Sequence, residues 1–183
     1  SITGVNPGKH GIYDFFLDVD LRRKSVKYAT SLNRKVKAVW DFLEDYDHKC
    51  VILNLPLTYP PLKINGAIVS GMFTPSHVKR YTYPPILSEE LRELGYKIDI
   101  GETLIKLLLL RNKKKLLLKE LVDLIKRREK ASIYLLRNFD WDLFFVVFIV
   151  LDRLQHLFMN HISRVIKGHM LDGITRYIIE VYA

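Results

Sequence analysis

Short apolar runs separated by polar stretches predict several buried strands. Residues 50–55 form an almost wholly apolar run that ends at Pro56, as a strand bounded by a breaker does. Residues 67–72, bordered by glycines, predict a second short strand. Residues 143–151 are nine consecutive apolar residues rich in Val, Ile and Phe, which favours a strand buried on both faces. This run is too short to cross a bilayer, which takes about 20 residues.

Apolar residues spaced three and four apart predict helices between these strands. Residues 31–46 show this spacing after Ser31, and Ser88 with Glu90 and Gly95 gives residues 88–94 the cap and stop of a short helix. Leucines recur in the same way over residues 101–136, which we expect to be one long helix or two helices separated at 111–115. The basic residues between the leucines are compatible with a membrane-surface helix, but such a stripe is more often an ordinary core face. The alternation of helix and strand predicts an α/β fold.

The remaining segments give weaker signals. Residues 3–12 are dense in turn formers and 24–31 are polar, so we expect loops at both. Residues 13–20 are aromatic and acidic and fit a short strand or irregular structure. Two further helical stripes follow at 157–166 and 170–181.

Asp152 and His156 follow the longest apolar run directly. A carboxylate just beyond a buried strand lies where open α/β sheets bind their ligands. If a helix begins at Asp152, His156 lies one turn further on the same face. An Asp and a His on one face are two plausible ligands for a divalent metal ion. The alternative is structural: Asp is a common helix N-cap, and the His then packs or meets solvent.

Composition narrows the class of protein. The chain has 183 residues, a net charge of +9 and 49% hydrophobic residues, which suits one domain with a sizeable core. The positive charge favours anionic partners such as phosphate esters, nucleic acid or acidic lipid. The sequence contains no recognisable helix-turn-helix or zinc-finger motif, signal peptide or transmembrane segment. Its single cysteine, Cys50, excludes an internal disulfide, and we expect a cytoplasmic location.

Several segments, taken in order, resemble the type I phosphodiesterase/nucleotide pyrophosphatase-like proteins of the alkaline phosphatase superfamily. Thr-Gly-Val-Asn-Pro-Gly-Lys-His-Gly-Ile-Tyr-Asp-Phe at 3–15 resembles the family segment just downstream of the nucleophile. Asp-Arg-Leu-Gln-His at 152–156 is similar to the family's Asp-x-x-x-His metal pair. The other matching segments are 54–61, 64–66, 69–71, 127–136 and 140–142.

The resemblance implies a metal-dependent hydrolase of phosphate esters, with nucleotide-type substrates among the possibilities. The family uses two divalent ions, usually zinc, and a Thr or Ser nucleophile that attacks phosphorus in line. Asp152 and His156 would ligate one of the two ions. The nucleophile is expected upstream of Ser1, and the family's Asp-His-Gly segment and its other ligands have no counterpart here. A catalytic zinc takes about three protein ligands, so we expect an incomplete site in this chain.

These features predict one incomplete α/β domain over residues 1–183. Its expected fold is part of an alkaline-phosphatase-like core, a mostly parallel sheet flanked by helices. Residues 1–100 would form a core segment with Pro-rich loops, 101–139 a helical insertion, and 140–183 a core strand with the metal-ligand pair and its following helices. Ser1 is no initiator methionine and the helical pattern still runs at Ala183, so we expect a middle part of a longer catalytic domain.

Two other hypotheses stay open from the sequence. The chain could be an inactive remnant that binds an anionic partner through its basic residues, with Lys113, Lys114, Lys115, Arg127 and Arg128 as the candidates. Binding of nucleic acid through phosphates would then depend steeply on salt. Alternatively, the chain is an unrelated α/β protein in which Asp152 caps a helix and His156 packs.

Overall fold

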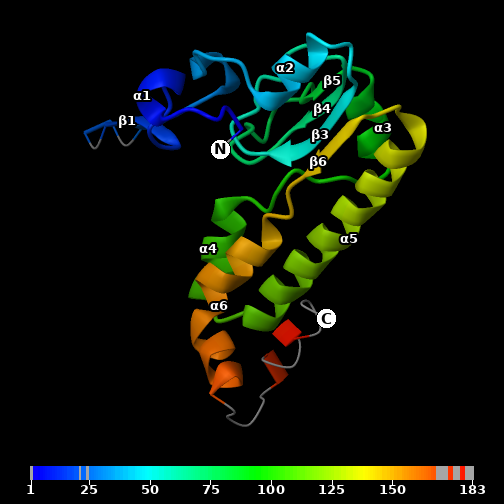
Figure 1. Cartoon of the computed structure of the whole chain (residues 1–183). Helices are drawn as coiled ribbons and strands as arrows, with labels where there is room; N and C mark the ends of the chain where they lie inside the picture. The colour runs from blue at the N-terminus through cyan, green and yellow to red at the C-terminus, as the bar shows by residue number, and fades with distance from the viewer. Residues whose placement is uncertain (1, 21, 24, 168–172, 175–177, 180–183) are drawn as a thin grey trace. The chain divides into compact units, whose positions relative to one another are not determined.

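The chain divides into two compact units in the computed structural model (Figure 1). The structure describes residues 2–20, 22–23, 25–167, 173–174 and 178–179. The first unit comprises Ser1–Ile98 and Ala131–Val147, and the second comprises Asp99–Lys130 and Phe148–Ala183. Helix α5 (Lys114–Asn138) contributes residues to both units.

A four-stranded sheet forms the centre of the first unit, in the order β5-β4-β3-β6. Strand β3 (Cys50–Leu55) pairs in parallel with β4 (Gly66–Ser70) and with β6 (Leu143–Val146). The short strand β5 (Thr82–Tyr83) adds to β4 in antiparallel orientation. The strands predicted at 50–55 and 67–72 are confirmed, as is the α/β class with a largely parallel sheet flanked by helices.

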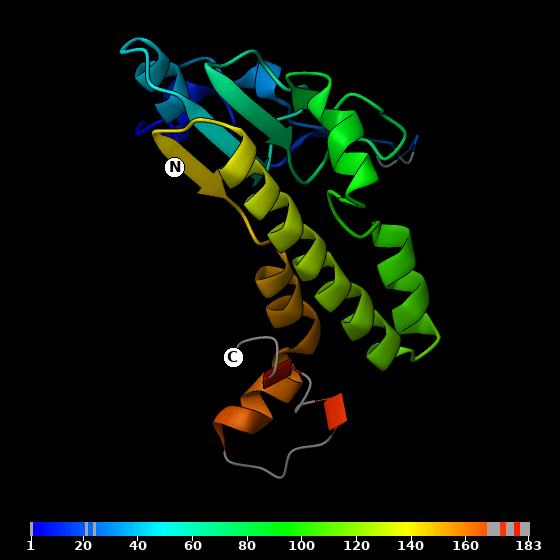
Figure 2. The ribbon, with the colours of Figure 1, turned by 90° about the vertical axis from the view of Figure 1, so that its right-hand side faces the viewer.

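Alternating residues of the strands cover both faces of this sheet. Val51 and Leu53 point to one face, where they pack against α3 (Leu87–Glu93) and the end of α5. Cys50 and Ile52 point to the opposite face and pack with Ala38, Trp40 and Ile68. Helix α2 (Val39–Glu44) lies on that second face (Figures 1 and 2). Burial on both faces explains why β3 is almost continuously apolar.

A separate two-stranded sheet occupies the N-terminal part of the first unit. Strand β1 (Phe16–Asp20) pairs in antiparallel orientation with β2 (Ser25–Tyr28) after the short helix α1 (Pro7–His10). The short strand considered for 13–20 is confirmed by β1. The loop predicted at 3–12 is wrong over α1, and the loop predicted at 24–31 is wrong over β2. Strand β2 alternates Ser and Lys with Val and Tyr and pairs with β1, and Tyr28 stacks on Phe73 at 4.9 Å between ring centroids.

The single helix predicted over 31–46 is wrong. A one-turn 3-10 helix, η1 (Ser31–Asn33), precedes α2, and the chain between them is extended at Arg34. The Asn33 side chain accepts hydrogen bonds from the backbone and hydroxyl of Thr30 and so closes the first turn locally. The side chain of Arg34 then takes the carbonyl oxygen of Val36 as its acceptor, which removes that oxygen from the helical ladder.

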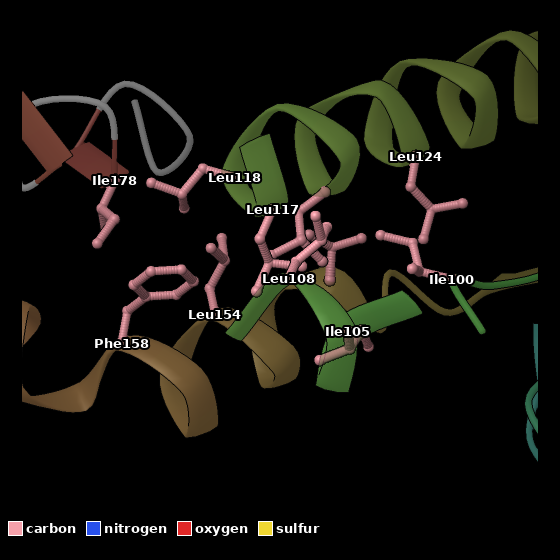
Figure 3. Packing of buried hydrophobic residues seen from close by; sticks show 11 residues of the cluster. Ile100, Ile105, Leu108, Leu117, Leu118, Leu124, Leu154, Phe158 and Ile178 are labelled. Atoms are coloured by element: carbon pink, nitrogen blue, oxygen red, sulfur yellow. The ribbon is translucent and has the colours of Figure 1, made fainter. Parts of the chain in front are cut away.

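Helices supply most of the described core of the second unit. The break expected near 111–115 is confirmed, because three residues separate α4 (Glu102–Leu110) from the start of α5 and one of them, Asn112, has a φ of 52°. The side chains of α4, the start of α5 and α6 (Val150–Ile166) meet in one apolar cluster (Figure 3). Its buried members are Ile100, Ile105, Leu108, Leu117, Leu118, Leu121, Leu124, Val150, Leu154, Phe158 and Ile178. Leu108 and the leucines of α5 in this list therefore form a core face, whereas Leu104 and Leu107 are each 40% exposed.

The nine-residue strand predicted at 143–151 is wrong in length. Strand β6 ends at Val146, and α6 begins at Val150. The pairing of β6 with β3 stops at Leu53, because Asn54 turns the β3 backbone with a φ of 63°. Val150 packs instead with Leu154 of its own helix in the second core. The stripe at 157–166 is helical, whereas most of the stripe at 170–181 falls outside the described residues.

No helix within the described ranges is both long and apolar enough to cross a membrane.

Candidate functional site

Helix α6 places Asp152 and His156 together on its solvent-facing side. Val150, Leu154 and Phe158 recur four apart and are buried in the core of the second unit. This anchoring fixes the opposite face outward, and the side chains of Asp152 and His156 are 59% and 78% exposed. Both side chains are therefore accessible to a ligand from solvent.

The distance between the two side chains suits a shared ligand. Nε2 of His156 lies 3.3 Å from Oδ1 of Asp152, one helical turn away. Two donors about 2.1 Å from one tetrahedral zinc ion stand about 3.4 Å apart, so the same rotamers would hold one ion with little movement. The distance equally fits a direct interaction between a carboxylate and a protonated imidazole. The carboxylate also lies in the first turn of the helix, where the helix dipole favours negative charge.

Arg153, between the two candidate ligands, is held by Asp99. Its Nε donates to Oδ1 of Asp99 at 3.0 Å, and its Nη2 forms a second, shorter contact with Oδ2. Both side chains are largely buried, and the two-contact geometry is the strong form of an arginine–carboxylate pair. The pair ties the first turn of α6 to the segment that leads into α4. Sequence reasoning missed Asp99, because no local pattern connects it with a residue 54 positions away.

Asp152 and His156 do not by themselves complete a catalytic metal site. Across the ranges that the structure describes, no group of three or more His, Cys, Asp or Glu side chains is placed to hold an ion. A catalytic zinc takes about three protein ligands and keeps one position open. Two donors fall short of such a set, so the pair alone would not hold a catalytic ion.

Other candidate donors have structural partners in the first unit. Nδ1 of His10 accepts a hydrogen bond from the backbone of Ile12, and Nδ1 of His48 lies 3.4 Å from Asp142. Cys50 is buried in the sheet, and desolvation raises the pKa of its thiol. A neutral, buried thiol is a poor metal ligand, because a metal binds the thiolate.

The sheet edge near β6 carries the clearest pKa shifts. The side chain of Lys49 donates to Asp140 at 2.8 Å, which raises the pKa of the lysine and lowers the pKa of that carboxyl. The backbone N–H of Lys49 donates to Asp142 at 2.7 Å and lowers the pKa of this second carboxyl. These groups are exposed and join the starts of β3 and β6, so their role is structural.

The basic residues considered for anion binding are in unlike environments. Lys113 and Lys115 are exposed near the start of α5. Arg127 pairs with Asp123 at 2.5 Å, and Arg128 is buried with only 2% of its surface exposed. The two arginines therefore belong to the packing of α5, and they do not extend an open cationic surface.

Comparison with known families identifies the chain. The chain has an α/β fold, and an accessible Asp–His pair lies on helix α6, which follows the edge strand β6 in the sequence. The family model of type I phosphodiesterase / nucleotide pyrophosphatase matches residues 1–177. The chain therefore belongs to this family of hydrolases, which confirms the resemblance seen in its motifs. No curated protein sequence and no solved structure matches the chain significantly.

Proposed function

We propose that Asp152 and His156 ligate one of two divalent ions, zinc being the first candidate, in a metal-dependent phosphodiesterase or phosphatase. The observation that carries the proposal is the 3.3 Å separation of Nε2 and Oδ1 on an exposed, well-anchored helix face. Membership of the phosphodiesterase family supports the same reaction class. The substrate would be a phosphate ester, with nucleotide-type diesters as the first class to test.

The bound ions would supply Lewis-acid stabilisation of the phosphoryl oxygens during in-line attack at phosphorus. The described residues contribute two donors and their positioning. Leu154 and Phe158 anchor the inner face of α6, and the Arg153–Asp99 pair holds its first turn. This support leaves the carboxylate and the imidazole one turn apart on the outer face, oriented toward a common point.

Zinc titration of the chain tests the ligand assignment. Structural sites with four ligands bind zinc with a free energy of about 10–16 kcal/mol. Two ligands should supply roughly half of this free energy, which corresponds to a Kd no tighter than about micromolar. We expect zinc to shift the NMR signals of the His156 imidazole, and we expect Asp152→Asn to remove this response. A stoichiometric nanomolar site would contradict the incomplete centre.

His48 provides a matched control for this titration. It also lies near a carboxylate, with Nδ1 at 3.4 Å from Asp142, and both side chains are about half exposed. His48→Gln should leave the zinc response of His156 unchanged. If zinc shifts the His48 imidazole as strongly as the His156 imidazole, zinc is binding to exposed His–Asp pairs in general and the assignment fails.

Hydrolysis is tested on the product of the complete reading frame. We expect zinc-dependent cleavage of bis(p-nitrophenyl) phosphate that falls by several orders of magnitude in Asp152→Asn and His156→Gln and persists in His48→Gln. Retention of full activity in both ligand variants would refute the catalytic assignment.

A further inference from the structure

An apolar cavity lies in the first unit at the carboxyl end of β3. Its volume is about 280 Å³, and Ile12, Trp40, Leu57 and Leu62 are among the residues that line it. Trp40 and a further lining residue, Ile68, belong to the buried core of the first unit, and this packing holds their side chains in place. Pockets for drug-sized ligands start near 300 Å³, so this cavity suits a single ring or a short branched chain.

Arg34 also lines this cavity and is largely buried, with 11% of its side chain exposed. Its Nη1 donates to the carbonyl oxygen of Val36 and to Oδ2 of Asp41, and its guanidinium stands 5.8 Å from the centre of the Trp40 ring. A guanidinium carries five N–H donors, of which these contacts use the two on Nη1. Within the part of the chain that the structure describes, Nε and Nη2 have no acceptor. Neither atom is among the fully buried polar atoms that lack a partner, so both are open to solvent, and an acceptor brought by a ligand could replace water on them.

Charge selects the kind of acceptor. Asp41 lies 2.5 Å from Arg34 and balances its positive charge. An anionic ligand would therefore gain little from Arg34 and would meet the Asp41 carboxylate nearby, whereas a neutral carbonyl oxygen still gains the hydrogen bonds. His10, which also lines the cavity, accepts the backbone N–H of Ile12 on Nδ1 and so carries its proton on Nε2 when the ring is neutral.

We propose that this cavity binds a compact apolar molecule that carries an uncharged carbonyl acceptor, such as a small aromatic amide. The ring occupies the apolar part of the cavity, and the carbonyl oxygen accepts from the free donors of Arg34. This inference concerns the first unit and does not depend on metal binding by Asp152 and His156.

Benzamide, benzoate and toluene test the proposal, because they share one ring and differ in the acceptor. Trp141→Phe leaves Trp40 as the single tryptophan, so its indole N–H signal in the NMR spectrum reports on the cavity directly. We expect a saturable shift with benzamide, and weaker binding of both toluene and benzoate. Arg34→Met should weaken benzamide about tenfold or more, since hydrogen bonds to charged groups are the stronger kind, and should leave toluene unchanged.

Two further variants separate binding from folding. Leu62→Phe fills the cavity and leaves the contacts of Arg34 in place, so it should abolish the shift without changing the backbone spectrum. Arg92→Met removes an exposed arginine of α3 and should bind benzamide like the parent. The proposal is overturned if benzamide gives no saturable shift, if toluene or benzoate binds as tightly as benzamide, or if a folded Arg34→Met or Leu62→Phe variant keeps the full affinity.

Discussion

Replacing Leu154 by alanine should destabilise the helix that carries the candidate ligands. Leu154 lies between Asp152 and His156 in sequence but points into the core of the second unit, where its side chain is 0% exposed (Figure 3). The substitution removes three carbon groups, and at about 0.8 kcal/mol each the transfer term alone is about 2.4 kcal/mol. The cavity left behind adds to this, so we expect a total loss of about 3–4 kcal/mol.

Urea unfolding followed by far-UV circular dichroism measures this loss. Leu151→Ala is the matched control, because the same side chain is removed from the neighbouring position of the same helix, where it is 39% exposed. We expect the control to cost less than about 1 kcal/mol, as surface substitutions usually do. Equal shifts of the midpoint for the two variants, or a loss below about 1 kcal/mol for Leu154→Ala, would refute the inward orientation of this helix face.

Two further predictions concern the first unit. Gly66→Ala should destabilise it by about 2 kcal/mol or more, because Gly66 has a φ of 125° and an added Cβ would lie 2.2 Å from the carbonyl oxygen of Cys50. Gly8→Ala is the control, because a Cβ added there would lie 3.4 Å from its nearest neighbouring atom, and it should change the unfolding free energy by less than about 1 kcal/mol. Similar losses of stability in both variants would count against the close approach at Gly66. Because the pKa of Asp142 is lower in the folded state, the free energy of unfolding should fall as the pH is lowered. The stabilisation from the Asp142 carboxylate is fully present above about pH 4, the pKa range of an unfolded Asp, and is lost as the pH drops through the lower folded pKa. Urea unfolding between pH 2.5 and 6 should show this dependence flattened in Asp142→Asn, and an unaltered profile would contradict the hydrogen bond from the Lys49 backbone.

Local patterns in the sequence determined several parts of this protein. The strand at 50–55 and the helical stripe with its break near 111–115 follow from burial and periodicity within a few residues. The family resemblance came from short motifs in a fixed order, and the match over residues 1–177 confirms it. Asp152 and His156 are on one helical face because residues four apart on any α-helix are neighbours.

Tertiary contacts decided what those patterns left open. The run at 143–151 is uniformly apolar, so nothing local shows that its first four residues pair with β3 while Val150 packs in a different core. Strand β2 is exposed at every position, so no buried face predicts it, and it is a strand because it pairs with β1. The predicted helix at 31–46 divides because Arg34 finds acceptors in Val36 and Asp41. In each case the competing conformations are close in local free energy, and contacts between residues brought together by the fold select one of them.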